Sequence, residues 1–124
     1  MSNYFNDVGE FHRKFGIPAY DPRVVCAFPS DKILEYRMKF LREELKELDD
    51  AIAAKDLVEA LDALADIVYV ACGTAHYFNA PFNHIWAEVQ RANLERVKCT
   101  PENCPLDKPI WRSEERRVGK ECRS

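Results

Sequence analysis

Apolar residues recur at helical spacing along most of the chain, and no stretch alternates in the manner of a strand. A first short helix is predicted by apolar residues three or four positions apart, namely Tyr4, Val8, Phe11 and Phe15. The sequence Gly16-Ile17-Pro18 is expected to stop this helix. Residues 19–29, which include two prolines, are predicted to form a loop.

Three further helices follow from the pattern. Ser30 suits the N-cap of a long second helix. Its main apolar stripe, predicted to face the core, consists of Leu34, Met38, Leu41, Leu45, Leu48 and Ile52. Asp56 can cap a third helix that runs to about Phe78, and Pro81 suits the start of a fourth at about 82–98. We therefore expect an all-α four-helix bundle whose second and third helices form an antiparallel hairpin.

Length and composition restrict the functional classes. A chain of 124 residues is expected to form one domain, and its net charge of −3 argues against a nucleic-acid surface. No apolar run approaches the roughly 20 residues of a membrane helix, and no signal-peptide pattern opens the chain. We therefore expect a cytoplasmic protein without membrane or nucleic-acid partners. Its five cysteines lack C-x-x-C spacing, which disfavours a disulfide framework or a zinc ribbon.

The C-terminal segment is treated separately from the rest of the chain. Residues 112–124, RSEERRVGKECRS, match the in-frame translation of a common sequencing adapter. We exclude this segment from functional interpretation, as for tags and fusion scars. The predicted domain is therefore 1–111, and we expect the natural C-terminal segment to be missing.

Acidic residues gather on two of the predicted helices. At about 100° per residue, Glu59, Asp62 and Asp66 fall within an arc of roughly 60° on the third helix. Because the rest of that helix is apolar or small, we expect it to be buried together with this polar seam. Glu44 and Glu47 flank a second apolar strip on the second helix. A hairpin that turns near residue 55 places Glu44 level with Asp66, and Glu47 level with Asp62 or its neighbour.

Carboxylates that converge in a partly desolvated cleft repel one another unless they are protonated or bind cations. Ligands that offer only oxygen suit Mg²⁺ or Mn²⁺. No glutamate has a histidine three residues later, which argues against a di-iron bundle. Structural interpretations remain open: Glu59 can complete a capping box with Asp56, and Glu43 can belong to surface pairs with Lys46 or Glu47.

Four stretches of the sequence resemble a known family. They are Glu43-Glu44-x-x-Glu47, the run ALADIVYVACGTAHYFNAP, the segment WAEVQRANLERV, and the opening GEFHRKFGIP. Together they resemble the MazG-like all-α nucleoside triphosphate pyrophosphatases, which include phosphoribosyl-ATP pyrophosphohydrolase and dimeric dUTPases. The resemblance covers about residues 4–111. It implies Mg²⁺-dependent hydrolysis between the α and β phosphates of nucleoside triphosphates, deoxynucleoside triphosphates above all, in nucleotide-pool control.

The resemblance also implies roles for the acidic residues. The implied metal ligands are Glu44, Glu47, Asp62 and Asp66, with Glu59 as an outer ligand. Ala63 stands where the family has a glutamate, and Asp62 is expected to replace it. Glu43, together with Glu44 and Glu47, is assigned to catalysis, with Glu43 as the residue that orients or deprotonates water.

Substrate contacts, partners and rival functions complete the predictions. Asn93 resembles the family's nucleotide-contacting asparagine. Arg91 and Arg96 are phosphate contacts or ordinary solvated residues, and His12 is a candidate base contact. Four modest helices with an acidic cleft are expected to complete their core as a homodimer or a tetramer. Two alternatives are phosphoribosyl-ATP hydrolysis and a non-catalytic helical module that binds a cation or a basic partner.

Overall fold

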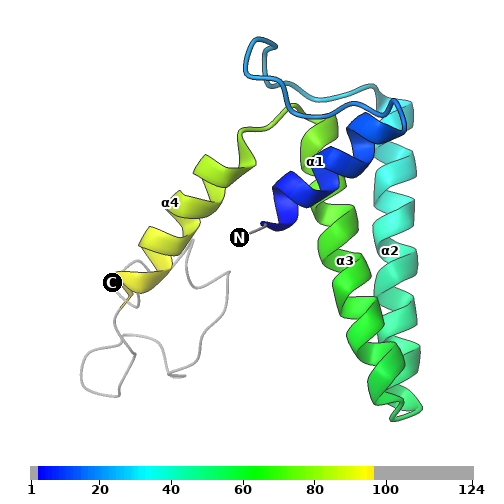
Figure 1. Ribbon diagram of the computed structural model, residues 1–124. Helices are drawn as coiled ribbons and strands as arrows, with labels where there is room; N and C mark the ends of the chain where they lie inside the picture. Colours follow the sequence, from blue (N-terminus) through cyan, green and yellow to red (C-terminus); the bar gives the residue numbers. More distant parts are fainter. Residues whose placement is uncertain (1–2, 97–124) are drawn as a thin grey trace. The chain divides into compact units, whose positions relative to one another are not determined.

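The computed structural model describes residues 3–96 and is all-α in that range, as predicted. Four helices follow one another: α1 (Tyr4–Lys14), α2 (Asp31–Ala53), α3 (Leu57–Tyr77) and α4 (Phe82–Leu94). Figure 1 shows α2 and α3 as a long hairpin, with α1 against its upper part. A second compact unit begins at Asn83.

The helix boundaries follow local capping chemistry. The Ser30 hydroxyl accepts a hydrogen bond from Ile33 N at 3.3 Å, and the Asp56 carboxylate accepts one from Glu59 N at 3.1 Å. Both predicted N-caps are therefore confirmed. The first helix stops before Gly16, whose φ of 70° lies in the left-handed region that glycine adopts at little cost.

The fourth helix is shorter than predicted. It ends at Leu94, where the backbone N–H of Arg96 turns back to the carbonyl of Asn93 at 3.2 Å and closes a tighter turn. The predicted end at about Lys98 lies outside the described residues. The proposed domain end at residue 111 and the adapter-like segment 112–124 also lie outside them. No helix within residues 3–96 is long and apolar enough to cross a membrane.

The buried face of α2 overlaps the predicted leucine-rich stripe only in part. The buried side chains of α2 repeat every seven residues and are Arg37, Glu44 and Ala51. Met38, Leu45 and Ile52 from the predicted stripe are exposed, whereas its other three members are half-buried, so the prediction that this stripe faces the core holds for only half of it. On α3 the facing residues include Ala63 and Val70, also seven apart. The buried line thus combines the small Ala51 and Ala63 with the polar Arg37 and Glu44.

The prediction that the third helix is buried on all sides is also wrong for the described chain. α3 packs against α2 and α1, and two neighbours cannot cover the full circumference of a helix. Its uncovered face carries large apolar side chains, namely Leu57, Val58, Leu61, Leu64 and Val68. These side chains form an exposed apolar row along α3.

The apolar core lies where α1 crosses the C-terminal half of α3. Phe5 and Val8 of α1 pack with Cys72 and Ala75 of α3. His76 ties the two helices together: its ring stacks on Phe5 at 3.9 Å, and its Nε2 donates to the Phe5 carbonyl at 2.8 Å. Because that carbonyl can only accept, Nδ1 of the neutral ring is the acceptor for a backbone N–H of the loop, at 2.8 Å.

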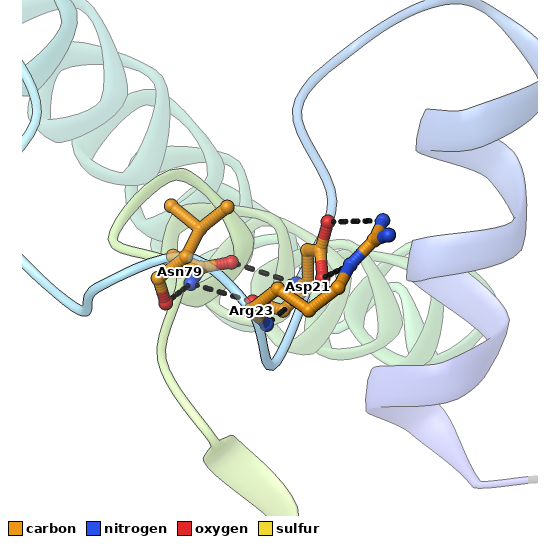
Figure 2. Close-up of polar contacts among 4 residues, drawn as sticks. Asp21, Arg23 and Asn79 are labelled. Carbon is orange, nitrogen blue, oxygen red and sulfur yellow. Dashed lines mark hydrogen bonds and ion pairs between the residues drawn. The ribbon is translucent and has the colours of Figure 1, made fainter.

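The loop between α1 and α2 is fastened to the end of α3 by Asn79 (Figure 2). Asn79 has a φ of 54°, a conformation that asparagine tolerates better than most residues. Its side chain accepts from Asp21 N at 2.7 Å and donates to the carbonyls of Asp21 and Val24. Arg23 in turn binds the Asp21 carboxylate at 2.9 Å. These contacts hold the loop beside the end of α3.

Candidate metal centre and adjoining pocket

Three carboxylates meet across the α2–α3 hairpin. Glu44 and Glu47 come from α2 and Asp66 from α3, and one oxygen of each lies within 4.8 Å of the others. Residues three apart share a face of α2, and the antiparallel turn brings Asp66 level with Glu44 as the sequence predicts. We call these three residues the acidic cluster.

Glu44 is the most enclosed member of the acidic cluster. Its side chain is 9% exposed, and its Oε2 is buried without a hydrogen-bond partner among the described residues. Burial raises the pKa of Glu44 above its ordinary value, and the nearby charges of Glu47 and Asp66 raise it further. Burying a carboxylate oxygen without a hydrogen-bond donor costs free energy. A proton or a cation bound to this atom would remove that cost.

The acidic cluster has the chemistry of a site for a hard divalent cation. All of its ligand atoms are carboxylate oxygens, which Mg²⁺ and Mn²⁺ prefer over the nitrogen and sulfur ligands of zinc. A cation held between Glu44, Glu47 and Asp66 would also neutralise the buried, unpartnered oxygen of Glu44. The residues present therefore fit such an ion.

The other predicted acidic residues lie outside the acidic cluster. Asp62 and Glu43 are exposed, and their charges contribute to the raised pKa of Glu44 from a greater distance. Glu59 is exposed in the first turn of α3, where its backbone N–H is capped by Asp56. The N–H of Asp56 donates to the carbonyl of Ala51 at 2.9 Å, so the reverse half of a capping box is taken by backbone.

A pocket of about 370 Å³ adjoins the acidic cluster, with Glu44 and Asp66 on its wall. Aromatic side chains from α1, α2 and α3 line it: Phe11, Tyr36, Phe40, Tyr69 and Tyr77. We call it the aromatic pocket. Aromatic walls beside a few fixed polar groups are typical of small-molecule sites that bind a flat ring.

Arg37 stands in the aromatic pocket and was not among the residues singled out from the sequence. It is 8% exposed and lies two turns before Glu44 on the same face of α2. Its Nε donates to Thr74 Oγ1 at 3.1 Å and its Nη2 to the Val70 carbonyl at 3.0 Å. Burial lowers the pKa of Arg37, although guanidinium remains charged in proteins. The signal in the sequence is the seven-residue spacing from Arg37 to Glu44, which places a cation in the hairpin seam.

His12, the predicted base contact, lines the same pocket from α1. It is 4% exposed, and its Nδ1 lies 2.6 Å from the Pro18 carbonyl. A carbonyl can only accept, so Nδ1 donates to it, and in the neutral tautomer with this proton Nε2 is an acceptor. Phe11 also lines the pocket, whereas the nearby Phe15 is exposed.

The predicted substrate residues of the C-terminal part lie on α4 or just after it. Arg91 is paired with Glu88 at 3.0 Å and with Glu95, and these hydrogen bonds raise its pKa. It therefore belongs to an exposed ion-pair network on the surface of α4, and its role as a phosphate contact stays a prediction. Asn93 lies on α4 and Arg96 follows it, and both are half-buried.

Comparisons with known proteins agree with this arrangement. The sequence matches the phosphoribosyl-ATP pyrophosphohydrolase family over residues 8–93, a span that contains the acidic cluster and the aromatic pocket. An uncharacterized protein of Acanthamoeba polyphaga mimivirus is 35% identical over 83 residues, which make up 64% of this chain and 32% of that protein. The chain thus spans about a third of that relative's length.

The family match confirms the resemblance seen in the sequence. The matched family lies within the MazG-like all-α superfamily of nucleoside triphosphate pyrophosphatases, whose members typically depend on a divalent metal. Since the match covers most of the chain and the described fold is all-α, the chain belongs to the phosphoribosyl-ATP pyrophosphohydrolase family of the MazG-like superfamily.

Proposed function

We propose that the protein hydrolyses nucleoside triphosphates, deoxynucleoside triphosphates above all, to the monophosphate and pyrophosphate, with Mg²⁺ or Mn²⁺ held by the acidic cluster. The observation that carries this proposal is the buried oxygen of Glu44, which has no hydrogen-bond partner within residues 3–96 and lies in a group of three carboxylates. The aromatic pocket beside the acidic cluster supports it, because a nucleotide has a flat base at one end and phosphates at the other.

The acidic residues serve the phosphate end of the substrate in this proposal. Glu44, Glu47 and Asp66 would hold the cation, with Asp62 and Glu59 further along the same face as outer acidic groups. When bound, the cation neutralises charge on the phosphate oxygens and activates water.

The hydrolytic step needs a residue that handles the proton of the attacking water. Glu43 is exposed and next to Glu44, so it can orient a water molecule without being a ligand in the acidic cluster. In this step the water oxygen bonds to phosphorus, the bridge between the α and β phosphates breaks, and pyrophosphate leaves. The proton of the water passes to Glu43.

A second candidate substrate is phosphoribosyl-ATP, because the matched family carries that name. The same bond between the α and β phosphates would break, so the chemistry of the acidic cluster serves both substrates equally. The two candidates differ in the group attached to the base. Only a comparison of substrates separates them.

The proposal includes a homodimer or a tetramer in the cytoplasm. Two rows of large apolar side chains are exposed on the first unit, one on α2 and one on α3. A second copy of this chain would remove such rows from water. Size-exclusion chromatography with light scattering gives the molar mass of the protein. A monomeric mass at micromolar concentration would contradict the proposed homodimer or tetramer.

The function is tested with the full chain and a substrate panel. Each nucleoside triphosphate, each deoxynucleoside triphosphate and phosphoribosyl-ATP is incubated with Mg²⁺ or with EDTA, and pyrophosphate is assayed separately from phosphate. Metal-dependent pyrophosphate from triphosphates is the expected result. Release from phosphoribosyl-ATP alone would favour the second candidate. No release from a folded, Mg²⁺-binding chain would leave a non-catalytic module that binds a cation or a basic partner.

A further inference from the structure

Arg37 lines the aromatic pocket and has N–H donors that make no hydrogen bond within the described fold. Two of its N–H groups donate to Thr74 and to the Val70 carbonyl, and its guanidinium lies 5.5 Å from the centre of the Phe40 ring and 5.1 Å from that of Tyr77. No carboxylate is paired with Arg37 among the described residues. The remaining N–H groups of this buried cation are therefore available to a ligand with an acceptor oxygen.

The hydrogen bonds around Arg37 do not require it for the fold. The Thr74 hydroxyl itself donates to the Val70 carbonyl at 2.8 Å, so that carbonyl keeps a donor when Arg37 is absent. A buried cation without a counter-ion costs solvation energy, and an apolar residue of similar volume often replaces such a group without loss. Stability alone therefore does not explain an arginine here.

His12 supplies the complementary group next to Arg37. Its Nδ1 proton is committed to the Pro18 carbonyl, which leaves Nε2 as an acceptor with no hydrogen-bond partner among the described residues. Nη2 of Arg37 and Nε2 of His12 lie 2.7 Å and 3.1 Å from the position that a Cβ would occupy on Gly73. Both nitrogens therefore lie close to Gly73, one as a donor and one as an acceptor, and both residues line the aromatic pocket.

We propose that Arg37 and His12 select nucleobases that present a carbonyl next to a ring N–H. Guanine, hypoxanthine, uracil and thymine have this lactam edge, in which the carbonyl accepts from Arg37 and the ring N–H donates to His12. Adenine and cytosine present an amino group next to a bare ring nitrogen, so both hydrogen bonds meet the wrong partner. This inference rests on the proposed function and names the class of base that its substrate carries.

The alternative role for Arg37 is a phosphate contact. The surroundings favour a base, because phosphate binding gathers several donors, whereas the walls around Arg37 are the rings of Tyr36, Phe40 and Tyr77. The acidic cluster, which repels bare phosphate, shares the same pocket and marks the end where a cation would hold the phosphates. The base is then placed at the Arg37 end.

Matched nucleotide pairs test the inference. dITP and dATP differ only in the oxo or amino edge of the purine, and dUTP and dCTP differ likewise among pyrimidines. Calorimetry on the full chain with Mg²⁺ compares dIMP with dAMP and dUMP with dCMP. We expect the oxo member to bind at least about tenfold more tightly, which corresponds to about 1.4 kcal/mol. Equal binding, preference for the amino member, or no saturable binding would overturn the inference.

Variants then assign the selectivity to Arg37. Arg37→Met keeps the side-chain volume and removes the donors, and Lys39→Met removes an exposed cation from the same helix as a control. In kcat/KM for pyrophosphate release, the dITP to dATP ratio should fall about tenfold in Arg37→Met and stay unchanged in Lys39→Met. An equal loss for both nucleotides would identify a phosphate contact and overturn the inference. If no triphosphate is hydrolysed, the proposed function fails, and the binding comparison still decides the selectivity.

Discussion

Replacing Glu44 by glutamine removes a buried negative charge while keeping the shape of the side chain. Its ligand oxygens and those of Glu47 and Asp66 lie within 4.8 Å of one another. At that separation one pair of charges repels by about 0.9 kcal/mol in water and about 3.5 kcal/mol at an effective dielectric constant of about 20. Glu47 is exposed and Asp66 is half-buried, so the value near that of water applies to each of the two pairs. We therefore expect Glu44→Gln to stabilise the metal-free protein by about 1 to 2 kcal/mol.

The assay is thermal unfolding of the wild type and Glu44→Gln in EDTA and in Mg²⁺. In EDTA the variant should unfold about 4 to 8 °C higher than the wild type. In Mg²⁺ at about ten times the dissociation constant, the wild type should gain about 1.4 kcal/mol and the variant much less. Glu35→Gln, an exposed acid on α2, is the matched control and should change neither value by more than about 0.5 kcal/mol.

The pH dependence of this difference has a definite sign. The folded pKa of Glu44 is raised above its ordinary value of 4.5, so ionisation costs the folded state more than the unfolded state. In EDTA the wild type should therefore lose stability relative to Glu44→Gln as pH rises from 4.5 through the raised pKa. A variant that is less stable than the wild type in EDTA at neutral pH would refute the reasoning, since Glu44 would then make a favourable contact without a cation.

Three further substitutions or conditions test the surrounding fold. Burial lowers the pKa of His76 below its ordinary value of 6.5. Both hydrogen bonds of His76 need the neutral ring. The stability that His76 contributes is therefore fully present above pH 6.5 and is lost as pH falls through the lowered pKa. Urea unfolding at a series of pH values should show this loss in the wild type and not in His76→Gln. Asn79→Gly keeps the left-handed backbone but loses the loop contacts and should cost about 1 to 3 kcal/mol in urea unfolding, with Asn79→Ala about 1 kcal/mol worse; equal stability of all three proteins would contradict this role. Gly9→Ala places a Cβ 2.7 Å from the buried His76 ring and should lower stability by about 1 to 3 kcal/mol in thermal unfolding, whereas an unchanged melting temperature would show that the ring can move.

Local chemistry made most of the helices predictable from the sequence. The caps at Ser30 and Asp56 and the stop at Gly16 act over three or four residues, so short motifs contain the whole signal. The position of Glu44 opposite Asp66 was also predictable, because an antiparallel turn of known position fixes the register of the two helices.

Packing between helices was harder to predict because several faces compete for burial. Leu45 is more apolar than Arg37 and Glu44, yet Leu45 is exposed and the two polar residues are buried, so the apolar pattern alone does not select the buried face. The aromatic pocket joins residues of three helices with no shared motif, so its Arg37 had no local signature beyond the spacing to Glu44. The roles of Glu59 and Asp62 stay predictions, since neither lies within the acidic cluster.

The most direct test of the central claim is the rate of pyrophosphate release from a deoxynucleoside triphosphate as a function of Mg²⁺ concentration. It is measured side by side for the wild type, Glu47→Gln and the control Glu35→Gln, each shown to be folded by circular dichroism. The account predicts saturable dependence on Mg²⁺ in the wild type and the control, and loss of at least about a hundredfold in Glu47→Gln. Pyrophosphate release that persists in EDTA, or at full rate in Glu47→Gln, would contradict it.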